Sequence, residues 1–477
     1  MDDIKILSQL YEEYSGEQPS SISALSGGGS GRRYYRLSGT IKDSGESSGY
    51  IGVVGASARD YRSFISLSKL FGDRGIKVPQ VLISSDKNCA YLQQDLGSVS
   101  LFDLITKGDD TKNIARIIAD SVRELARLQE TPENLWGPLA GYAPFDRRQV
   151  IWDLNYFKYE YLLPSGINFD ENALEDDFEK FSSEIYRNSV DLSGFMYRDC
   201  QSRNIMICNG SPWWIDFQGG RKGPGVYDLV SLLWQAKADF SDEFRNQMID
   251  IYLNEKQQLS SSPIYKDFET FNKIVNLYAI FRTLQVLGAY GLRGLVERKA
   301  HFIESIPFAL NNLKNLLKKG VCDDYPELKT VCEAACMDSR FRNAGHKGLR
   351  IEVFSFSYKK GYPNDFSGNG GGFMFDCRGM HNPGRYEEYK KLTGKDKPVI
   401  DFLESHGEVQ KFVDNAFALV EGTIRNYIDR GFSNLQIGFG CTGGHHRSVY
   451  CAERMANLLR IKFSETDVIL THREHQN

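Results

Sequence analysis

Three polar residues at fixed spacing, within residues 194–236, constrain this chain more than any other feature. Asp199 is followed five positions later by Asn204, and an apolar run then leads to Asp216 in Ile-Asp-Phe. The apolar segments between Asn204 and Asp216 can pair as a short hairpin, which would bring that amide and that carboxylate together. The chain must therefore fold so that one loop carboxylate faces a second carboxylate and an amide.

This arrangement suits transfer of a phosphoryl group to a hydroxyl. A carboxylate has to accept or orient the hydroxyl proton, while carboxylate and amide oxygens hold Mg²⁺ on the phosphates. Asp199 fits the first role, and Asn204 with Asp216 fits the second. Asp228, at the start of the next apolar helix, is better suited to bond the loop backbone or cap that helix. The alternative is that each Asp is only a turn former or a cap.

Length and hydrophobic pattern predict several units, because 477 residues exceed one ordinary domain. Strand-like runs predict a small lobe at 1–97, and helical periodicity predicts a helical lobe with the polar loop at 98–315. A lysine-rich, cysteine-containing segment is expected to be a linker at 316–348. Strands alternating with helices predict a small α/β domain at 349–477. The expected fold class is α/β, as a two-lobed α+β domain followed by a small α/β domain.

Composition excludes several classes of protein. The net charge of -4 shows no excess of positive charge that would indicate nucleic acid or a membrane surface. The nine cysteines are scattered rather than regularly spaced, which is typical of reduced thiols and not of a disulfide framework. The N-terminal segment lacks a secretory signal pattern and no apolar run is long enough to span a bilayer. We therefore expect a cytoplasmic location and no membrane partner.

A glycine-rich run precedes a strand near the N-terminus. Residues 26–31 read Ser-Gly-Gly-Gly-Ser-Gly, and the apolar run at 50–54 is the natural hairpin partner of the strand that follows them. Glycines let the backbone approach a phosphate closely and point its N–H groups inward. The alternative is a flexible loop. The residues expected to bind nucleotide are Gly28, Gly29, Gly31, Arg32 and Arg33.

The segments at 197–204, Tyr-Arg-Asp-Cys-Gln-Ser-Arg-Asn, and at 215–218, Ile-Asp-Phe-Gln, resemble the motifs of the aminoglycoside phosphotransferase family. The longer stretch around them is most similar to AmgK-like anomeric sugar kinases of cell-wall recycling, which phosphorylate the 1-hydroxyl of N-acetylmuramate and N-acetylglucosamine. The resemblance covers about residues 1–315. It implies a kinase-like fold, catalytic roles for Arg198 and Asp199, and ATP and Mg²⁺ as cofactors.

Two positions depart from the family pattern. Tyr197 stands where such kinases usually have His. No lysine occurs in the strand at 51–54, although a lysine there normally pairs the phosphates with a helix glutamate. We expect Arg32 or Arg33 to supply the positive charge instead. The alternative is that catalysis is impaired and the chain is a regulatory binding protein with a degenerate kinase domain.

Acceptor recognition is expected from the helical lobe. Asp153, Tyr156 and Glu160 follow one another along a helical stretch, and they are polar and aromatic enough to bond and stack on a sugar. Tyr156 at helical spacing is equally consistent with an ordinary core position. The acceptor pocket has no readable motif, so another small hydroxylated acceptor remains an alternative.

A glycine-containing loop joins the strand-like run at 435–440 to a helix. Free N–H groups and the helix dipole make such a loop an anion site, to which Arg447 adds a bidentate clamp. The Cys441-x5-Arg447 spacing also occurs in cysteine phosphatases, whose mechanism needs a general acid. In this chain Asp376 and Asp396 are positional candidates for that acid, and the phosphatase alternative stays open. The residues expected at the anion site are Cys441, Thr442, Gly443, Gly444, His445, His446, Arg447 and Ser448.

Residues 350–473 resemble the C-terminal domain of the RNase adapter protein RapZ. The shared stretches include Ser-Phe-Ser-Tyr-Lys-Lys-Gly at 355–361, Phe-Asp-Cys-Arg at 375–378 and the loop at 440–448. The resemblance implies a partner that is an amino-sugar phosphate, glucosamine-6-phosphate, or a small RNA. From residue 349 onward the chain has 17 Lys and Arg against 16 Asp and Glu, which is a poor balance for RNA. We therefore expect metabolite sensing rather than RNA binding.

Overall fold

The chain divides into two compact units in a computed structural model. The first unit comprises Met1–Gly291 and Phe308–Met337, and the second comprises Leu292–Pro307 and Asp338–Asn477. No helix in the described ranges combines the length and the apolar character that a membrane span requires. The described residues are 2–25, 31–40, 47–108, 110–260, 263–338, 341, 348–363, 372–405, 407–432 and 434–475.

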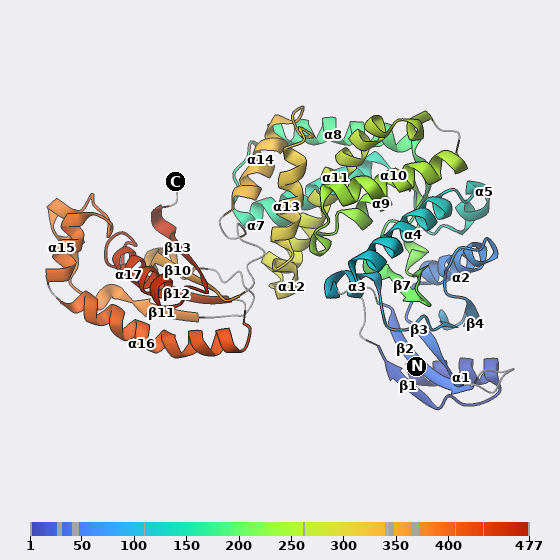
Figure 1. Ribbon diagram of the computed structural model, residues 1–477, viewed down its shortest axis with the longest axis horizontal. Coiled ribbons are helices and arrows are strands. Elements are labelled where there is room, and N and C mark those ends of the chain that lie inside the picture. The colour runs from blue at the N-terminus through green and yellow to red at the C-terminus, as the bar shows by residue number, and fades with distance from the viewer. Residues whose placement is uncertain are drawn as a thin grey trace. The chain divides into compact units, whose positions relative to one another are not determined.

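An antiparallel sheet forms the N-terminal lobe of the first unit (Figure 1). Its five strands lie in the order β1-β2-β3-β5-β4, and β2 pairs with β3 as the sequence predicted. Helix α1 packs against this sheet, and α2 connects β3 to β4. The elements are α1 (Asp3–Ser15), β1 (Ser21–Ala24), β2 (Arg33–Thr40), β3 (Ser47–Val54), α2 (Ala58–Asp73), β4 (Val81–Ser85) and β5 (Ala90–Gln94).

A glycine in β3 allows helix α1 to pack closely on the sheet. Leu7 and Leu10 of α1 are buried on its sheet-facing side, as the helical periodicity predicts. A Cβ atom at Gly52 of β3 would lie 2.7 Å from Leu7 Cδ2 and 2.9 Å from Leu37 Cδ1. Glycine at this position therefore lets the helix lie close to the strand.

Helices make up most of the second lobe. Two short antiparallel strand pairs flank its loop at 197–204. Strand β6 pairs with β9, and β7 pairs with β8, all antiparallel. The β7–β8 pair is the hairpin that the sequence predicted between Asn204 and Asp216. The elements are α3 (Leu101–Lys107), α4 (Thr111–Gln129), α5 (Glu133–Trp136), α6 (Arg147–Phe157), α7 (Leu163–Ser165), α8 (Glu171–Asp191), β6 (Ser193–Met196), β7 (Ile205–Cys208), β8 (Ser211–Trp214), β9 (Arg221–Pro224), α9 (Gly225–Leu233), α10 (Asp242–Leu259), α11 (Phe268–Tyr290), α13 (Ile306–Leu317) and α14 (Pro326–Met337).

The structure differs from the linker expected at 316–348. Residues 326–337 form helix α14, which packs on α8 within the first unit. Asp177 of α8 accepts the backbone N–H groups of Glu327 at 2.7 Å and Leu328 at 2.9 Å, which satisfies the exposed start of α14. Asp177, about 150 residues away in sequence, thus anchors a segment that its lysines and cysteines had predicted to be a linker.

The second unit carries a four-stranded parallel sheet in the order β11-β12-β10-β13. The buried side chains of α16 and α17 pack with those of the strands in one hydrophobic core. The mixture of helix and sheet in both units confirms the predicted α/β class. The elements are α12 (Ala300–Ile303), β10 (Arg350–Ser357), β11 (Gly372–Asp376), α15 (Lys397–Ser405), α16 (Glu408–Asp429), β12 (Asn434–Cys441), α17 (Arg447–Lys462) and β13 (Asp467–His472).

Candidate active site

A buried carboxylate holds the loop that carries Asp199. Asp228, in the first turn of α9, is fully buried and accepts the backbone N–H groups of Tyr197 at 2.7 Å and Arg198 at 2.8 Å. Burial raises the pKa of Asp228 from 3.8 to about 7, although the two N–H groups oppose the shift. Arg198 takes a left-handed backbone conformation with a φ of 77°. Asp228 thus has the structural role that the sequence predicted, and it fixes the loop just before Asp199.

The Asp199 side chain is exposed, while its backbone is anchored. Its carbonyl oxygen accepts Nδ2 of Asn204 at 2.9 Å and the N–H of Gln201 at 2.8 Å. A Cβ atom at Gly219 would lie 4.0 Å from Asp199 Oδ2, so the turn after Asp216 comes close to this carboxylate. The loop therefore presents an open carboxylate on a rigid support, as a base that orients a hydroxyl requires.

The β7–β8 hairpin brings Asn204 and Asp216 together. Ile205 pairs with Trp214, and the N–H of Ile215 donates to the carbonyl of Asn204 at 3.0 Å. Asp216 follows directly in a left-handed conformation with a φ of 69°. Because Asn204 uses its Nδ2 to hold Asp199, its Oδ1 is the atom available to a metal.

One carboxylate and one amide oxygen match what Mg²⁺ takes from a protein when phosphates and waters complete its octahedron. The residues that would hold it are Asn204 and Asp216. In the described part of the chain, no group of three or more His, Cys, Asp and Glu side chains is arranged to hold a metal by itself. The donor set therefore fits an ion that arrives with a nucleotide.

Arg32 contacts Asp216 directly. Its Nη2 lies 2.5 Å from Asp216 Oδ1, and the side chain is only 9% exposed. Burial alone would lower the pKa of Arg32, but Asp216 more than compensates and raises it overall. Gln218 Nε2 donates to the same carboxylate oxygen at 2.9 Å. Arg32 thus brings a positive charge to the predicted metal site in a domain whose β3 strand has no lysine.

The other residues expected to bind nucleotide divide into two groups. Gly28 and Gly29 lie outside the described residues, and Gly31 is exposed beside Gly55. Arg33 does not join Asp216, because its guanidinium contacts Asp3 of α1 at 2.5 Å and 2.8 Å. Successive residues of an extended segment point to opposite faces, so Arg32 and Arg33 cannot both reach one site.

Arg221 of β9 is a cation that the sequence reasoning missed. Its Nε donates to the carbonyl of Gly219 at 3.2 Å, and its guanidinium stacks 4.7 Å from the ring of Tyr142. Burial, together with nearby Arg198, lowers its pKa, while Asp199 has the opposite effect. The only sequence signal was an arginine in the Gly-Gly-Arg-Lys-Gly run just after Asp216.

Helix α6 places Asp153, one of the predicted acceptor residues, next to Arg198 of the catalytic loop. The carboxylate of Asp153 binds Arg198 Nη2 at 3.0 Å, and Gln149 Oε1 accepts Arg221 Nη1 at 3.4 Å. Tyr156 lies one turn further along α6, and Glu160 lies in the π-helix Lys158–Leu162 that follows α6. Asp153 therefore positions Arg198, the residue directly before Asp199.

In the second unit, the predicted anion loop lies between β12 and α17, at the carboxyl ends of the parallel strands. Thr442 and Gly443 are exposed, and Ser357 of β10 donates to the Thr442 carbonyl at 2.8 Å. His445 Nδ1 lies 3.2 Å from His475 Nε2, and His446 Nε2 lies 2.9 Å from the carbonyl of Tyr389. The loop is thus exposed at Thr442 and Gly443, while contacts of the residues on either side fix its backbone.

Arg447 and Cys441 are buried rather than directed outward. Arg447 is 4% exposed, and its Nη1 donates to the carbonyls of Arg378 at 3.0 Å and Met380 at 2.8 Å. Cys441 is 3% exposed, and its Sγ accepts the N–H of Gly444 at 3.2 Å and lies 3.1 Å from Ser448 Oγ. In this structure Arg447 therefore stabilises the turn that contains Arg378 and Met380, and its role as an anion clamp stays a prediction.

A sheet lobe, a helical lobe and a loop with Asp199, Asn204 and Asp216 define a two-lobed phosphotransferase domain. The chain belongs to the phosphotransferase enzyme family, whose model matches residues 21–261. Residues 349–476 match the model of the RapZ C-terminal domain. Both families that the sequence resembles are thereby confirmed.

Curated relatives share only part of the chain. A nucleotide-binding protein of Corynebacterium efficiens is 28% identical over 235 residues, 49% of this chain and 70% of that one. A nucleotide-binding protein of Paraburkholderia phymatum is 38% identical over 135 residues, 28% of this chain and 43% of that one. The chain thus spans less than half of the second relative.

Solved structures of small-molecule kinases are similar at low identity. An ethanolamine kinase of Plasmodium vivax has 17% identity and a TM-score of 0.41, with 62% of this chain and 82% of that one covered. An amicoumacin kinase in complex with AMP-PNP, Ca²⁺ and its ligand has 13% identity and a TM-score of 0.46, with 67% and 94% covered. A GDP complex of a 2′-aminoglycoside phosphotransferase has 15% identity and a TM-score of 0.45, with 66% and 99% covered.

Proposed function

We propose that this protein transfers the γ-phosphoryl group of ATP to a sugar hydroxyl in the presence of Mg²⁺. The convergence of Asp199, Asn204 and Asp216 on one hairpin and its preceding loop carries the proposal. Arg32, in contact with Asp216, and Arg221, near Asp199, supply positive charge where phosphates would lie. Phosphoryl transfer depends mainly on positioning and charge stabilisation, and these residues serve both.

In the proposed reaction, Asp199 orients the acceptor hydroxyl and takes its proton. The hydroxyl oxygen forms a bond to the γ-phosphorus as the bond to the β-phosphate oxygen breaks, and ADP leaves with that electron pair. Arg198, held by Asp153, and Asp228, which binds the backbone, keep Asp199 in place. Asn204 Oδ1 and Asp216 would hold Mg²⁺, which would neutralise charge on the phosphates.

We infer that the acceptor is an amino sugar, with the anomeric hydroxyl of N-acetylmuramate or N-acetylglucosamine as the reacting group. The resemblance of residues 197–218 to anomeric sugar kinases supports this acceptor. Asp153 of α6, which binds Arg198 of the catalytic loop, supports a polar acceptor beside this loop, and we expect Tyr156 and Glu160 to contact the sugar as well.

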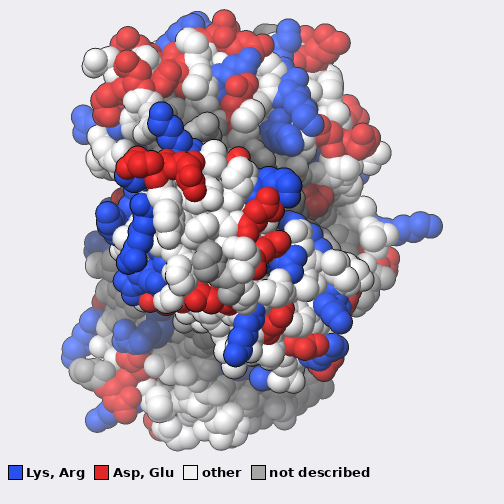
Figure 2. Space-filling view, turned by 90° about the vertical axis from the view of Figure 1, so that its left-hand side faces the viewer, with Lys and Arg blue, Asp and Glu red and all other residues white. Residues whose placement is uncertain are grey.

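For the second unit we propose recognition of an amino-sugar phosphate at the loop 441–448. The open tip of the loop and the start of α17 favour an anion there. On the face that Figure 2 displays, Lys and Arg side chains lie in small groups among Asp and Glu side chains. Such alternation suits a small anion better than the long backbone of RNA.

One observation favours a different function for the first unit. The strand β3 lacks a lysine, and Arg32 is bound to the carboxylate that a metal would need. A regulatory protein that binds nucleotide without turnover would share these features. Incubation of the full chain with ATP, Mg²⁺ and a panel of amino sugars separates the two functions, because only the kinase forms a sugar phosphate detectable by ³¹P NMR.

A further inference from the structure

The segment at 139–145 joins the two lobes of the first unit beside the catalytic loop. On the side of the sheet lobe, Ser63 of α2 is buried, and its Oγ donates to the carbonyl of Leu139 at 2.9 Å. On the side of the helical lobe, the N–H of Phe145 donates to the carbonyl of Lys222 in β9 at 2.7 Å. The segment therefore bridges α2 and β9.

Tyr142, in the middle of this segment, contacts both lobes with one side chain. Its hydroxyl donates to Asp60 Oδ1, in the first turn of α2, at 2.8 Å. The guanidinium carbons of Arg59 on α2 and of Arg221 on β9 lie over its ring, 3.9 Å and 4.7 Å from the centroid. A Cβ atom at Gly141 would lie 2.5 Å from Arg59 Cγ, so a glycine lets the segment approach α2 this closely. Tyr142 thus connects α2 to Arg221.

Arg221 is a partly buried cation that only neutral groups hold. Its Nε donates to the Gly219 carbonyl at 3.2 Å, and its Nη1 donates to Gln149 Oε1 at 3.4 Å. Among the residues that the structure describes, it forms no ion pair with a carboxylate. Burial of a charge without a counterion is unfavourable, and the ring of Tyr142 offsets part of this cost because a ring face attracts a cation. The positive charge of Arg221 therefore remains available to a bound anion.

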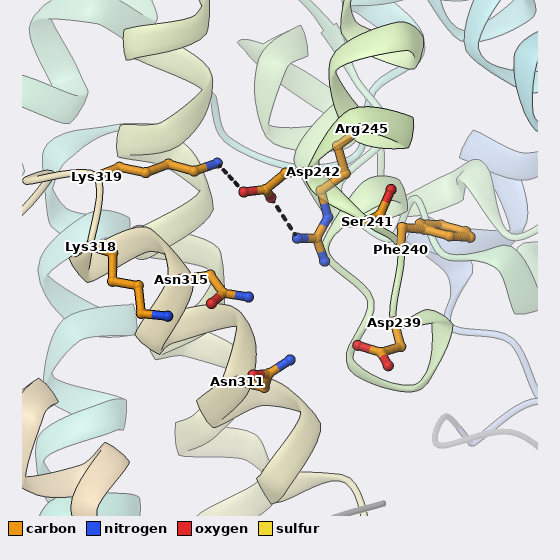
Figure 3. Close-up of a pocket in the computed structure, with 9 residues that line it drawn as sticks. All are labelled: Asp239, Phe240, Ser241, Asp242, Arg245, Asn311, Asn315, Lys318 and Lys319. Carbon is orange, nitrogen blue, oxygen red and sulfur yellow. Dashed lines mark hydrogen bonds and ion pairs between the residues drawn. The ribbon is translucent and has the colours of Figure 1, made fainter.

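Arg245 and Arg198, by contrast, are each neutralised by a carboxylate. Arg245 Nη1 binds Asp242 at 3.3 Å at the start of α10, as Figure 3 shows. Arg198 Nη2 binds Asp153 at 3.0 Å. Arg221 lacks such a partner although it is close enough to Arg198 for the two charges to interact. A cation left without a counterion at this place indicates that a bound group supplies the negative charge.

Arg221 also lies close to the atoms that are proposed to react. It is anchored to Gly219, where a Cβ atom would lie 4.0 Å from Asp199 Oδ2. Burial and the nearby Arg198 lower the pKa of Arg221, whereas the charge of Asp199 acts in the opposite direction. In a phosphotransferase, the γ-phosphoryl group meets the acceptor hydroxyl at the carboxylate that takes the proton. The γ-phosphoryl group is therefore the anion that fits beside Arg221.

We propose that Tyr142 is a positioning residue that holds Arg221 against the γ-phosphoryl group of the bound nucleotide and fixes this contact relative to α2 of the sheet lobe. This inference rests on the proposed phosphoryl transfer and assigns a role to a residue outside the catalytic loop. The ring of Tyr142 acts on the guanidinium of Arg221, while its hydroxyl bond to Asp60 fixes the ring.

Isothermal titration of the full chain with AMP-PNP and with ADP, each with Mg²⁺ and without an acceptor, isolates the γ-phosphoryl contact. We expect the wild type to bind AMP-PNP more tightly than ADP. Tyr142→Leu should lower the affinity for AMP-PNP about fivefold, a factor within the range of a cation–π contact, and leave the affinity for ADP unchanged. Tyr142→Phe keeps the ring and should retain the preference for AMP-PNP. Tyr186→Leu, on α8, is the matched control and should change neither affinity.

A double-mutant cycle separates this positioning from a general structural role. Arg221→Ala should lower the affinity for AMP-PNP at least as much as Tyr142→Leu, and the double variant should lose no more than Arg221→Ala alone. Losses that multiply in the double variant would overturn the proposal, as would a Tyr142→Phe protein as weak as Tyr142→Leu. A wild type that binds both nucleotides equally would also overturn it. If Tyr142→Leu does not fold, an unchanged preference for AMP-PNP in Arg221→Ala would have the same consequence.

The proposed function is tested separately by formation of a sugar phosphate. A loss of AMP-PNP preference in Tyr142→Leu, with no sugar phosphate formed by the wild type, would leave the role of Tyr142 standing and reject transfer to a sugar. Formation of a sugar phosphate, together with a nucleotide preference that Tyr142→Leu does not alter, would do the reverse.

Discussion

Arg32 and Asp216 form an ion pair across the first unit, with Nη2 2.5 Å from Oδ1 and the arginine almost fully buried. The pair joins the end of the glycine-rich segment to the residue that follows the β7–β8 hairpin. It places a guanidinium where the β3 strand offers no lysine. The relationship therefore links the nucleotide side of the domain to the predicted metal ligand.

The first prediction compares two neighbouring arginines. Arg32→Ala should lower kcat/KM for ATP by about 10- to 100-fold, because it removes about 1.4–3 kcal/mol of phosphate stabilisation. Arg33→Ala should leave kcat/KM near the wild-type value, since its guanidinium binds Asp3 on the other face. Steady-state kinetics with varied ATP measure both. Equal losses in the two variants would contradict the assignment of the phosphate-facing cation.

Tyr197, which replaces the usual His, gives a prediction for stability. Its hydroxyl donates to the carbonyl of Ile215, and its side chain is fully buried. Tyr197→Phe should lower the free energy of unfolding by about 1–3 kcal/mol, because that carbonyl loses its partner. Tyr186→Phe, at a position 41% exposed on α8, is the control and should change little. Urea denaturation followed by tryptophan fluorescence provides the measurement.

Asp228 predicts a pH dependence of stability. Its folded-state pKa is raised from 3.8 to about 7, so the folded protein holds a proton that the unfolded chain releases between these values. The contribution of Asp228 to the free energy of unfolding should thus be largest below pH 4, fall by a few kcal/mol as the pH rises to about 7, and stay constant above that. In Asp228→Asn this slope should be absent. Denaturation curves at several pH values would contradict the account if both proteins showed the same slope.

The loop of the second unit predicts binding without Cys441 chemistry. Cys441→Ser should retain affinity for glucosamine-6-phosphate, since a hydroxyl can also accept the N–H of Gly444. Arg447→Ala should lower the melting temperature, because the carbonyls of Arg378 and Met380 lose a buried donor. Differential scanning calorimetry and calorimetric titration measure these effects. Hydrolysis of p-nitrophenyl phosphate by the wild type, lost in Cys441→Ser, would instead establish the phosphatase alternative.

The catalytic constellation was the part most accessible to sequence reasoning. The hairpin is local, so the spacing of Asn204 and Asp216 is enough to predict that these residues lie close together. The pairing of the apolar strands β7 and β8 then holds them in place. The choice between Arg32 and Arg33 was not accessible, because it depends on which face of the extended segment turns toward Asp216. Arg221 was missed for a related reason, since its place depends on the pairing of β9 with β6.

For the segment at 316–348, the composition predicted a linker although the spacing of its apolar residues predicted a helix. Leu328, Val331, Cys332 and Ala335 are buried on one face of α14, at a spacing that predicts an amphipathic helix. The lysines and cysteines around them are typical of a polar junction and obscure that spacing. The anchor at Asp177 lies on a distant helix, and no local signal could reveal it. Arg447 is similar, because its acceptors are carbonyls of a turn about 70 residues earlier.

The most direct test of the central claim is transfer of the γ-phosphoryl group from [γ-³²P]ATP to N-acetylmuramate or N-acetylglucosamine, measured for the wild type and for Asp199→Asn. The wild type should form a sugar phosphate in the presence of Mg²⁺. Asp199→Asn should retain ATP binding and fold but lose at least about 100-fold in kcat, because the proton acceptor is gone. Full activity in Asp199→Asn, or a wild type that binds ATP and Mg²⁺ yet phosphorylates no sugar, would contradict the account.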